Sequence, residues 1–125
     1  MMIRRWVVGA ALGAAVFVLM AVAGGAWEGY TPNNLTFSGP VALPSVVLPA
    51  GTYVFEQPSF NSPEIVRVLS EDRKHVYFMA FTREVVRPQG LGDRPVTFGE
   101  AQLGAPPPIA VWYPIDSATG HEFIY

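Results

Sequence analysis

The chain offers few groups of side chains whose types and spacing could support catalysis. It contains only two histidines, His75 and His121, and no cysteine. His121 precedes Glu122 directly and follows Asp116, so a general base stands near two carboxylates, whereas His75 beside Glu71 and Asp72 is most simply part of a solvated turn. A hydrolase that uses His121, Glu122 and Asp116 is therefore the catalytic alternative to test.

Known catalytic and metal-binding motifs are absent from the sequence. It contains no G-x-S-x-G or H-E-x-x-H element, and its serines stand in turn contexts. Gly90-Leu91-Gly92 lacks the strand-to-helix setting of a phosphate loop, and no carboxylate pair has a spacing that specifies glycosidase chemistry. We therefore expect no catalytic residues, no metal ligands and no cofactor, and we interpret the protein as a non-enzyme.

Aromatic residues are the remaining candidates for binding. Tyr77, Met79 and Phe81 share one face of the longest strand candidate. Phe78 lies on the opposite face, so the strand is apolar on both sides. This pattern is typical of a central strand covered on both faces or of a strand that awaits a partner, and we favour the core. If these residues were exposed, they would form an apolar surface that could bind a sugar, a lipid or another protein chain. The predicted ligand-binding residues are Tyr77, Phe81, Trp112 and Tyr113.

The elements that would position these side chains are short β-strands. No window after residue 27 has a sustained helical period, and prolines interrupt every long window. The charged stretch Glu71-Asp72-Arg73-Lys74 predicts a hairpin loop. We expect an all-β fold, a single antiparallel β-sandwich of about seven or eight short strands over residues 36–125. The segments with strand signals, from which these strands are drawn, are Thr36-Phe37, Val41–Leu43, Val46–Leu48, Thr52–Gln57, Glu64–Ser70, His75–Arg87, Val96–Gln102, Ile109–Tyr113 and Glu122–Tyr125.

The first part of the chain has the pattern of an export signal. Arg4 and Arg5 precede an uncharged run from Trp6 to Trp27. A basic start, an apolar stretch and small residues at its end are typical of a signal peptide. We predict a signal peptide over residues 1–26, with an uncleaved membrane anchor as the alternative, and an extended entry segment over 27–35. The protein is thus expected to be exported to the periplasm, the cell surface or the exterior.

Charge and cysteine content narrow the range of partners. After residue 26 the chain has six basic and ten acidic residues, a net charge of −4. Nucleic-acid binding needs a basic face, so we expect no nucleic-acid partner. Membrane contact is expected only through residues 1–26, if they stay attached. Without disulfides, an exported domain of this size depends on its core or on a partner.

Five segments together form a recognisable pattern. They are Thr36–Pro44, Val47–Phe55, Ile65–Arg87 with its charged turn, Trp112-Tyr113-Pro114 and Gly120–Tyr125. This pattern resembles an uncharacterised family of small exported bacterial β-proteins. The resemblance covers nearly all of the chain after the predicted signal peptide, and it implies a small exported β-domain without implying any activity.

One of these segments has a second resemblance. The piece Leu48–Phe55 is similar to the L-P-x-G-x-Y element of transthyretin-like and carboxypeptidase-regulatory-type sandwich modules. That similarity implies that Gly51 makes the turn into a strand. It also implies that the Tyr53 ring packs while its hydroxyl bonds the backbone.

These observations predict a binding function rather than a catalytic one. We expect a non-enzymatic exported interaction or structural module of the bacterial cell envelope or exterior. Its partner would be a protein, including a second copy of itself, bound through a sheet edge and the aromatic face. The alternative is a domain that binds a small ligand, sugar or lipid, in an aromatic pocket.

Overall fold

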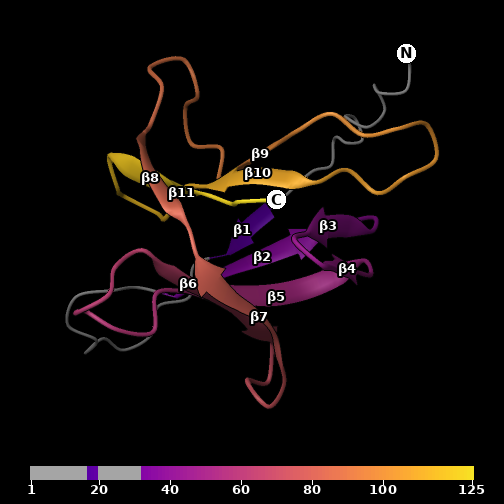
Figure 1. Ribbon diagram of the computed structural model, residues 1–125, viewed down its shortest axis with the longest axis horizontal. Helices are drawn as coiled ribbons and strands as arrows, with labels where there is room; N and C mark the ends of the chain where they lie inside the picture. The colour runs from indigo at the N-terminus through magenta and orange to yellow at the C-terminus, as the bar shows by residue number, and fades with distance from the viewer. Residues whose placement is uncertain (1–16, 20–31) are drawn as a thin grey trace.

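The computed structural model of the protein describes residues 17–19 and 32–125. These residues form an all-β fold without a helix, and every pairing between strands is antiparallel. The first sheet contains, in spatial order, β1 (Phe17–Leu19), β2 (Asn33–Phe37), β5 (Gly51–Glu56), β6 (Ile65–Ser70) and β7 (Val76–Phe81). The second contains β8 (Arg83–Val86), β11 (Thr119–Glu122), β10 (Ile109–Trp112) and β9 (Val96–Phe98). A hairpin of β3 (Val41–Leu43) and β4 (Val46–Leu48) lies at one end (Figure 1).

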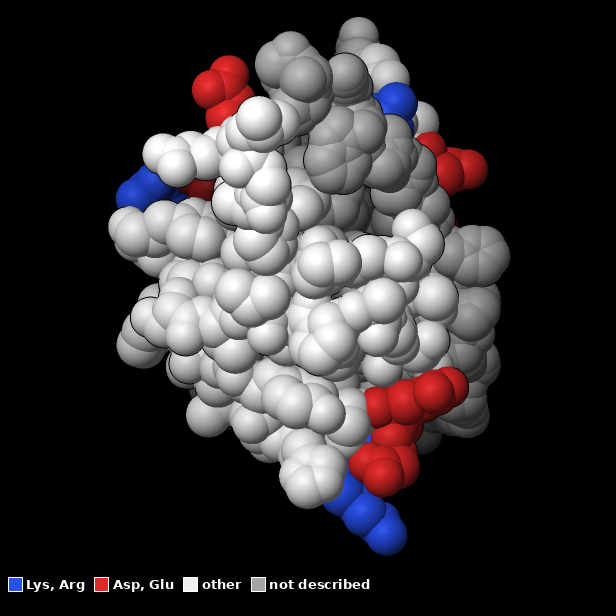
Figure 2. Space-filling model, turned by 90° about the vertical axis from the view of Figure 1, so that its right-hand side faces the viewer, with Lys and Arg blue, Asp and Glu red and all other residues white. Residues whose placement is uncertain are grey.

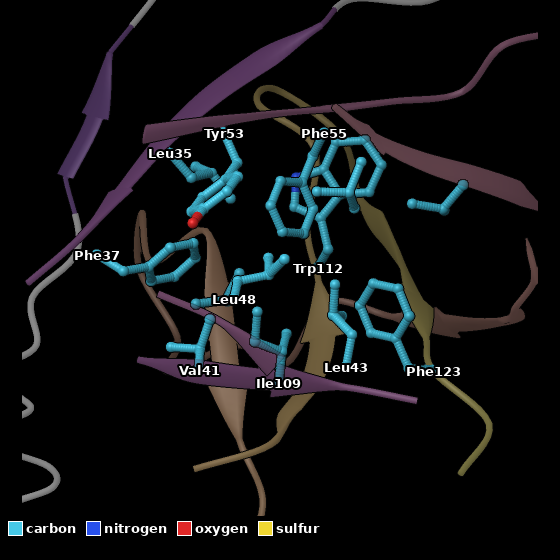
Figure 3. Close-up of a cluster of buried hydrophobic side chains, with 13 residues drawn as sticks. Leu35, Phe37, Val41, Leu43, Leu48, Tyr53, Phe55, Ile109, Trp112 and Phe123 are labelled. Atoms are coloured by element: carbon cyan, nitrogen blue, oxygen red, sulfur yellow. The ribbon is translucent and has the colours of Figure 1, made fainter. Parts of the chain in front are cut away.

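The core lies between the two larger sheets, and the β3–β4 hairpin closes one side of it (Figure 3). Phe55 of the first sheet contacts Trp112 of the second, with ring centroids 5.7 Å apart. The Ala42 N–H donates to the Pro107 carbonyl at 2.9 Å, which ties the hairpin to the segment before β10. The arrangement is sandwich-like. The core cluster comprises Leu35, Phe37, Val41, Leu43, Leu48, Tyr53, Phe55, Val66, Val68, Val96, Ile109, Trp112 and Phe123.

One extended segment passes from the first sheet to the second. β7 ends at Phe81, β8 begins at Arg83, and Thr82 between them donates its N–H to the Glu64 carbonyl beside β6. Arg87 donates its N–H to the Ala118 carbonyl beside β11. Backbone groups alternate between the two edges of a strand, so residues five apart bond opposite edges. The segment therefore pairs with β6 on one edge and with β11 on the other, and it joins the two sheets at a corner.

The strand that is buried on both faces is β5, not β7. Tyr53 and Phe55 lie in the core, and Val54 and Glu56 on the opposite face are also buried. β5 lies between β2 and β6, whereas β7 is the last strand of its sheet. A central position, more than the apolar pattern along a strand, decides burial on both sides.

The prediction that both faces of β7 are packed in the core is therefore wrong. Met79 pairs with Arg67, and Phe81 pairs with Ile65, so both lie on the face opposite the core. Their exposed fractions are 56% and 60%. The register shifts beside Val68 and Leu69, so Tyr77 does not continue this row. Its ring meets that of the buried Tyr53 edge-on, with centroids 5.6 Å apart.

The strand boundaries differ from expectation mainly in the last third of the chain. β9 ends at Phe98: Gly99 still donates its N–H to the Pro108 carbonyl at 2.8 Å, but Pro108 has no N–H to continue the pairing. The closing strand is Thr119–Glu122 rather than Glu122–Tyr125. Phe123 enters the core, and the Tyr125 hydroxyl donates to the Ile109 carbonyl at 2.7 Å. Three-residue strands and the corner at Thr82 also raise the strand count above the predicted seven or eight.

The predicted signal peptide, 1–26, lies outside the described residues except for Phe17–Leu19. These three residues form β1 and pair with β2. Of the predicted entry segment, residues 33–35 belong to β2. Over 17–19 and 32–125, no helix has the length and hydropathy needed to cross a membrane.

Charged residues are unevenly distributed over the surface. Residues 29–55 and 101–115 contain no charged side chain. The first stretch includes the β3–β4 hairpin, and the second includes much of the β9–β10 connection; both project toward the same side of the molecule (Figure 1). Figure 2 shows that side as a broad uncharged surface, with acidic and basic side chains at its margins.

Candidate functional site

Two regions of the molecule differ from an ordinary small-domain surface: a polar pocket and an open sheet edge. The pocket has a volume of about 530 Å³. It lies where the end of β8, the loop 88–95 and the turn after β10 meet. Its lining residues are Asn33, Arg87, Gly92, Asp93, Pro95, Tyr113, Ile115 and Asp116.

Arg87, directly after β8, holds the two loops of the pocket together. Its Nη1 donates to the Gly92 carbonyl at 2.8 Å, and its Nε donates to the Ser117 carbonyl at 3.0 Å. Longer bonds, each 3.4 Å, reach the carbonyls of Arg94 and Pro114. Among the described residues the guanidinium makes no ion pair with a carboxylate. Four of its five N–H donors are thus committed to backbone carbonyls, and its role is to position the loops.

Tyr113 forms the floor of the pocket, and its ring is fixed by two contacts. The Arg87 guanidinium lies over the ring, with its Cζ 5.1 Å from the centroid. Gly120 approaches so closely that a Cβ there would stand 2.4 Å from the Tyr113 Cδ1. Position 120 therefore needs glycine because of this close approach.

Asn33 connects the two sheets beneath the pocket. This side chain at the start of β2 is 4% exposed. Its Oδ1 accepts a hydrogen bond from the Trp112 indole Nε1–H at 3.2 Å and another from the Ile115 N–H at 3.1 Å. Reading the sequence did not select Asn33. The only feature of the sequence that could have indicated a role for Asn33 is that this polar residue lies close to apolar strand residues.

The predicted hydrolase residues are not brought together. His121 faces the core and stacks on Trp112, with ring centroids 5.2 Å apart. Glu122, the next residue on the strand, lies on the other face and pairs with Arg83 at 3.1 Å. Asp116 lines the pocket in a turn, with a φ of 60°. This geometry gives His121 no carboxylate within hydrogen-bonding distance among the described residues.

His121 has a structural role at the corner between the sheets. The single proton of the Thr82 hydroxyl goes to the Glu64 carbonyl at 2.7 Å, so its oxygen accepts from His121 Nδ1 at 3.1 Å. Nδ1 therefore carries a proton. Burial lowers the pKa of His121, and the nearby charge of Glu84 opposes this only in part. A neutral, Nδ1-protonated imidazole fits these contacts, and no group of three or more His, Cys, Asp or Glu in the described residues has a metal-binding arrangement.

The four predicted ligand-binding aromatics do not line one pocket. Trp112 is fully buried in the core, and Tyr113 lies under the polar pocket. Tyr77 and Phe81 belong to β7 in the other sheet. Alternation along a strand indicates which residues share a face, but it does not show which strands become neighbours.

The turn residues behave as the similarity to L-P-x-G-x-Y modules implied. Gly51 begins β5 directly after the turn at Pro49. The Tyr53 hydroxyl donates to the Pro49 carbonyl at 2.6 Å, and its ring packs in the core. Burial, helped by the nearby Tyr77, raises the pKa of the Tyr53 phenol. Both residues are structural.

The second region is the outer edge of β7. Thr82, Ala80 and Phe78 turn their backbone groups toward β6, so the N–H and C=O groups of Met79 and Phe81 point the other way. Within the described part of the chain, no backbone group bonds this edge. The exposed side chains along it are Val76, Tyr77, Met79 and Phe81.

The sheet behind this edge is held rigid by a buried carboxylate. Glu56 is 1% exposed, and it accepts from Arg67 Nε at 2.8 Å and from Arg73 Nη2 at 2.8 Å. Arg73 belongs to the predicted charged turn, which Asp72 also stabilises. The hydrogen bond from the Ser70 hydroxyl lowers the pKa of Asp72. These contacts link β5, β6 and the β6–β7 turn, so β7 is presented on a fixed support.

Comparison with known proteins adds no relative. No family model, no curated protein and no solved structure matches this chain. The resemblance to small exported bacterial β-proteins thus remains a prediction, and function must be argued from the pocket and the edge themselves.

Proposed function

We propose that the protein is a non-enzymatic interaction module that self-associates by adding β7 of one copy to β7 of another. The observation that carries this proposal is that β7 ends its sheet while Val76, Met79 and Phe81 are exposed. Pairing two such edges antiparallel would satisfy the outward backbone groups and bury apolar side chains in one step. This is the arrangement expected for a homodimer with two-fold symmetry.

The β7 edge lacks the usual protection against pairing. Exposed edge strands commonly carry lysine, proline or inward-pointing charges that prevent addition of another strand. From Val76 to Phe81 the sequence has neither proline nor any charged residue. The register shift near Tyr77 is the one protective feature present, and it leaves Met79 and Phe81 in regular pairing. An edge of this kind favours a partner strand.

The self-complementary apolar pattern of the edge favours a second copy as that partner. An antiparallel pair centred on Met79 places Tyr77 of one copy opposite Phe81 of the other. Beyond Phe81 the outer edge is occupied by β11, which pairs with β8 from Arg83 onward, so the paired stretch is confined to β7.

A cysteine cross-link tests this register directly, because the chain has no cysteine of its own. At the two-fold axis the two Met79 Cα atoms would be about 5.5 Å apart, which is within the span of a disulfide. We expect Met79→Cys to form a disulfide-linked dimer under mild oxidation. The matched control is Leu103→Cys in the β9–β10 connection, where the native residue is 80% exposed.

The interpretation of this experiment depends on the difference between the two variants. Equal cross-linking at both positions, or none at Met79→Cys, would overturn the proposed interface. A second comparison uses Met79→Lys and Leu103→Lys, with mass measured by sedimentation equilibrium. Met79→Lys should weaken dimerisation at least about ten-fold, since it places a charge in the paired edge, while Leu103→Lys should leave it unchanged. The full chain is used throughout, so any association through residues 1–26 is common to both variants.

We place this module outside the cytoplasm of a bacterial cell. The support is the uncharged run after Arg4 and Arg5 and the absence of cysteine from the chain. The intact mass of the protein recovered from a bacterial host tests the prediction. A mass that begins after residue 23 or 26 supports cleavage, a full-length chain in the membrane fraction supports an anchor, and a full-length chain in the cytosol contradicts export.

A further inference from the structure

The polar pocket carries an inference that is independent of the β7 edge. We propose that it binds a neutral, polyhydroxylated ligand of about monosaccharide size. The inference rests on the arrangement of hydrogen-bonding groups in the pocket, on two buried polar groups that have no partner among the described residues, and on the rigidity of the loops.

The groups that the pocket offers to a ligand are mainly acceptors. Asp93 and Asp116 line it from two different loops, and neither makes an ion pair in the described part of the chain. Arg87 also lines it, but four of its five N–H donors are engaged by carbonyls of the same loops. A ligand with hydroxyl groups can donate to both carboxylates without competing for the guanidinium.

Two buried polar groups in the lining lack partners among the described residues. Tyr113 is 4% exposed, and its hydroxyl makes no hydrogen bond there. Asn33 uses only its Oδ1, which leaves both Nδ2–H donors without an acceptor. Burying unpaired donors is costly, and native proteins rarely tolerate it without a binding partner. These two groups supply the donors that complement the carboxylates.

This combination selects the chemical class of the ligand. An anion would face Asp93 and Asp116, with only one Arg87 N–H left to offset the repulsion. An ammonium ion would satisfy the carboxylates but would give Asn33 Nδ2 nothing to bind. Hydroxyl groups both donate and accept, so a neutral polyol is the class that satisfies every group of the pocket. Ile115, partly exposed in the lining, offers an apolar contact for C–H groups.

The pocket is also preformed and of suitable size. Its volume of about 530 Å³ lies within the range of small-molecule sites. The Arg87 contacts fix the loop 88–95 to the turn 114–117, and Tyr113 N–H donates to the Pro95 carbonyl at 2.8 Å. Loops that are ordered before binding lose little entropy when a ligand enters.

The test is a titration of the isotopically labelled full chain with D-glucose and D-galactose, followed by NMR. The Trp112 indole N–H and the Asn33 side-chain NH₂ report on the pocket, because they share the Asn33 amide. We expect saturable shifts of these signals with dissociation constants of about millimolar, as is typical of small ligands. n-Butylammonium chloride and sodium phosphate serve as the cationic and anionic comparison ligands.

Isosteric variants identify the groups that bind. Asp93→Asn and Asp116→Asn should each weaken sugar binding about ten-fold, because each removes a hydrogen bond to a charged acceptor. The matched control, Glu100→Gln, removes the same charge from an exposed position outside the pocket lining and should leave affinity unchanged. Asparagine tolerates the positive φ of position 116, so the fold is preserved.

Three results would overturn the proposal. They are no shift of the Trp112 and Asn33 signals with either sugar, tighter binding of n-butylammonium or phosphate than of both sugars, and equal affinity in Asp93→Asn, Asp116→Asn and Glu100→Gln. The wild-type titration alone decides the first two, even if a variant does not fold. The proposed dimer interface is not involved, so Met79→Lys should bind sugar as the wild type does.

Discussion

The pocket and the β7 edge are built from one continuous strand segment, yet they differ in almost every physical respect. In the first half of this segment, β7 exposes apolar side chains, and its outward backbone groups have no partner among the described residues. In the second half, β8 leads into Arg87, four of whose five N–H donors reach backbone carbonyls. The edge is an unsatisfied surface, whereas the pocket is a network of polar contacts that fixes its own shape.

This difference implies that the residues of the pocket contribute to the stability of the fold, whereas the exposed residues of β7 contribute mainly to association. Groups at the pocket bond atoms of the core and of both sheets, so changing them should alter folding as well as binding. Side chains on the outer face of β7 contact little of their own chain, so changing them should affect association alone. The predictions below test this separation, beginning with the largest expected effect.

The largest effect on stability is expected at Asn33. Asn33→Ala removes the acceptor of the buried Trp112 indole N–H and of the partly buried Ile115 N–H. Each unpaired donor costs about 1–3 kcal/mol, so the free energy of unfolding in urea should fall by about 2–4 kcal/mol. Asn34→Ala, the neighbour on the opposite face of β2, is the control and should change it by less than about 0.5 kcal/mol. Equal losses in both variants would show that Asn33 does not join the sheets.

Gly120 should be nearly as sensitive, for a steric reason. Gly120→Ala places a methyl group against the Tyr113 ring, which the Arg87 guanidinium covers. Overpacking of this kind costs about 1–3 kcal/mol, measurable as a lower urea midpoint. Gly39→Ala meets no atom within 4 Å and should be neutral. If Gly120→Ala were as stable as Gly39→Ala, the close approach at the pocket floor would not exist.

The stability of the protein should depend on pH because of His121, which lies at the corner between the two regions. Burial lowers the pKa of His121 below its ordinary value of 6.5, so the unfolded chain takes up the proton first as the pH falls. The stabilisation is therefore complete above pH 6.5 and decreases below it. His121→Gln should reduce this slope, and His75→Gln, at an exposed turn, should retain it. The hydrogen-bonded Asp72 contributes only in a more acidic window, below its ordinary pKa of 3.8.

The smallest effect on stability is expected at the edge. Met79→Lys should change the free energy of unfolding of the monomer by less than about 0.5 kcal/mol, because the side chain is 56% exposed. Thermal unfolding at a concentration where the wild type is monomeric measures this. A large loss of stability would mean that Met79 packs within its own chain, and the contrast between edge and pocket would fail.

Much of the fold could be predicted from local patterns. Alternation in Ile65–Ser70 correctly separated Val66 and Val68 from Arg67, because successive side chains of a strand point to opposite faces. The charged stretch after Ser70 correctly predicted a turn. For β7 the same reasoning indicated two apolar faces, but it did not show that the strand has a neighbour on one side only.

The candidate site could be predicted from the sequence only in small part. Arg87, Asp93, Tyr113 and Asn33 come from distant parts of the chain, and no short motif connects them. Tyr113 was selected for its ring, whereas its place in the pocket depends on a guanidinium above it and a glycine beside it. Polar groups become a site only when the backbone brings their donors and acceptors together.

Local residue patterns specify an all-β, antiparallel domain, because proline spacing excludes long helices and alternation requires sheets. They do not specify which apolar strand is central, which one is an edge, or which polar residues meet in the pocket, because alternation is a local property of the backbone. Strand order and loop contacts are set by non-local packing, as at the corner where Thr82 binds both Glu64 and His121.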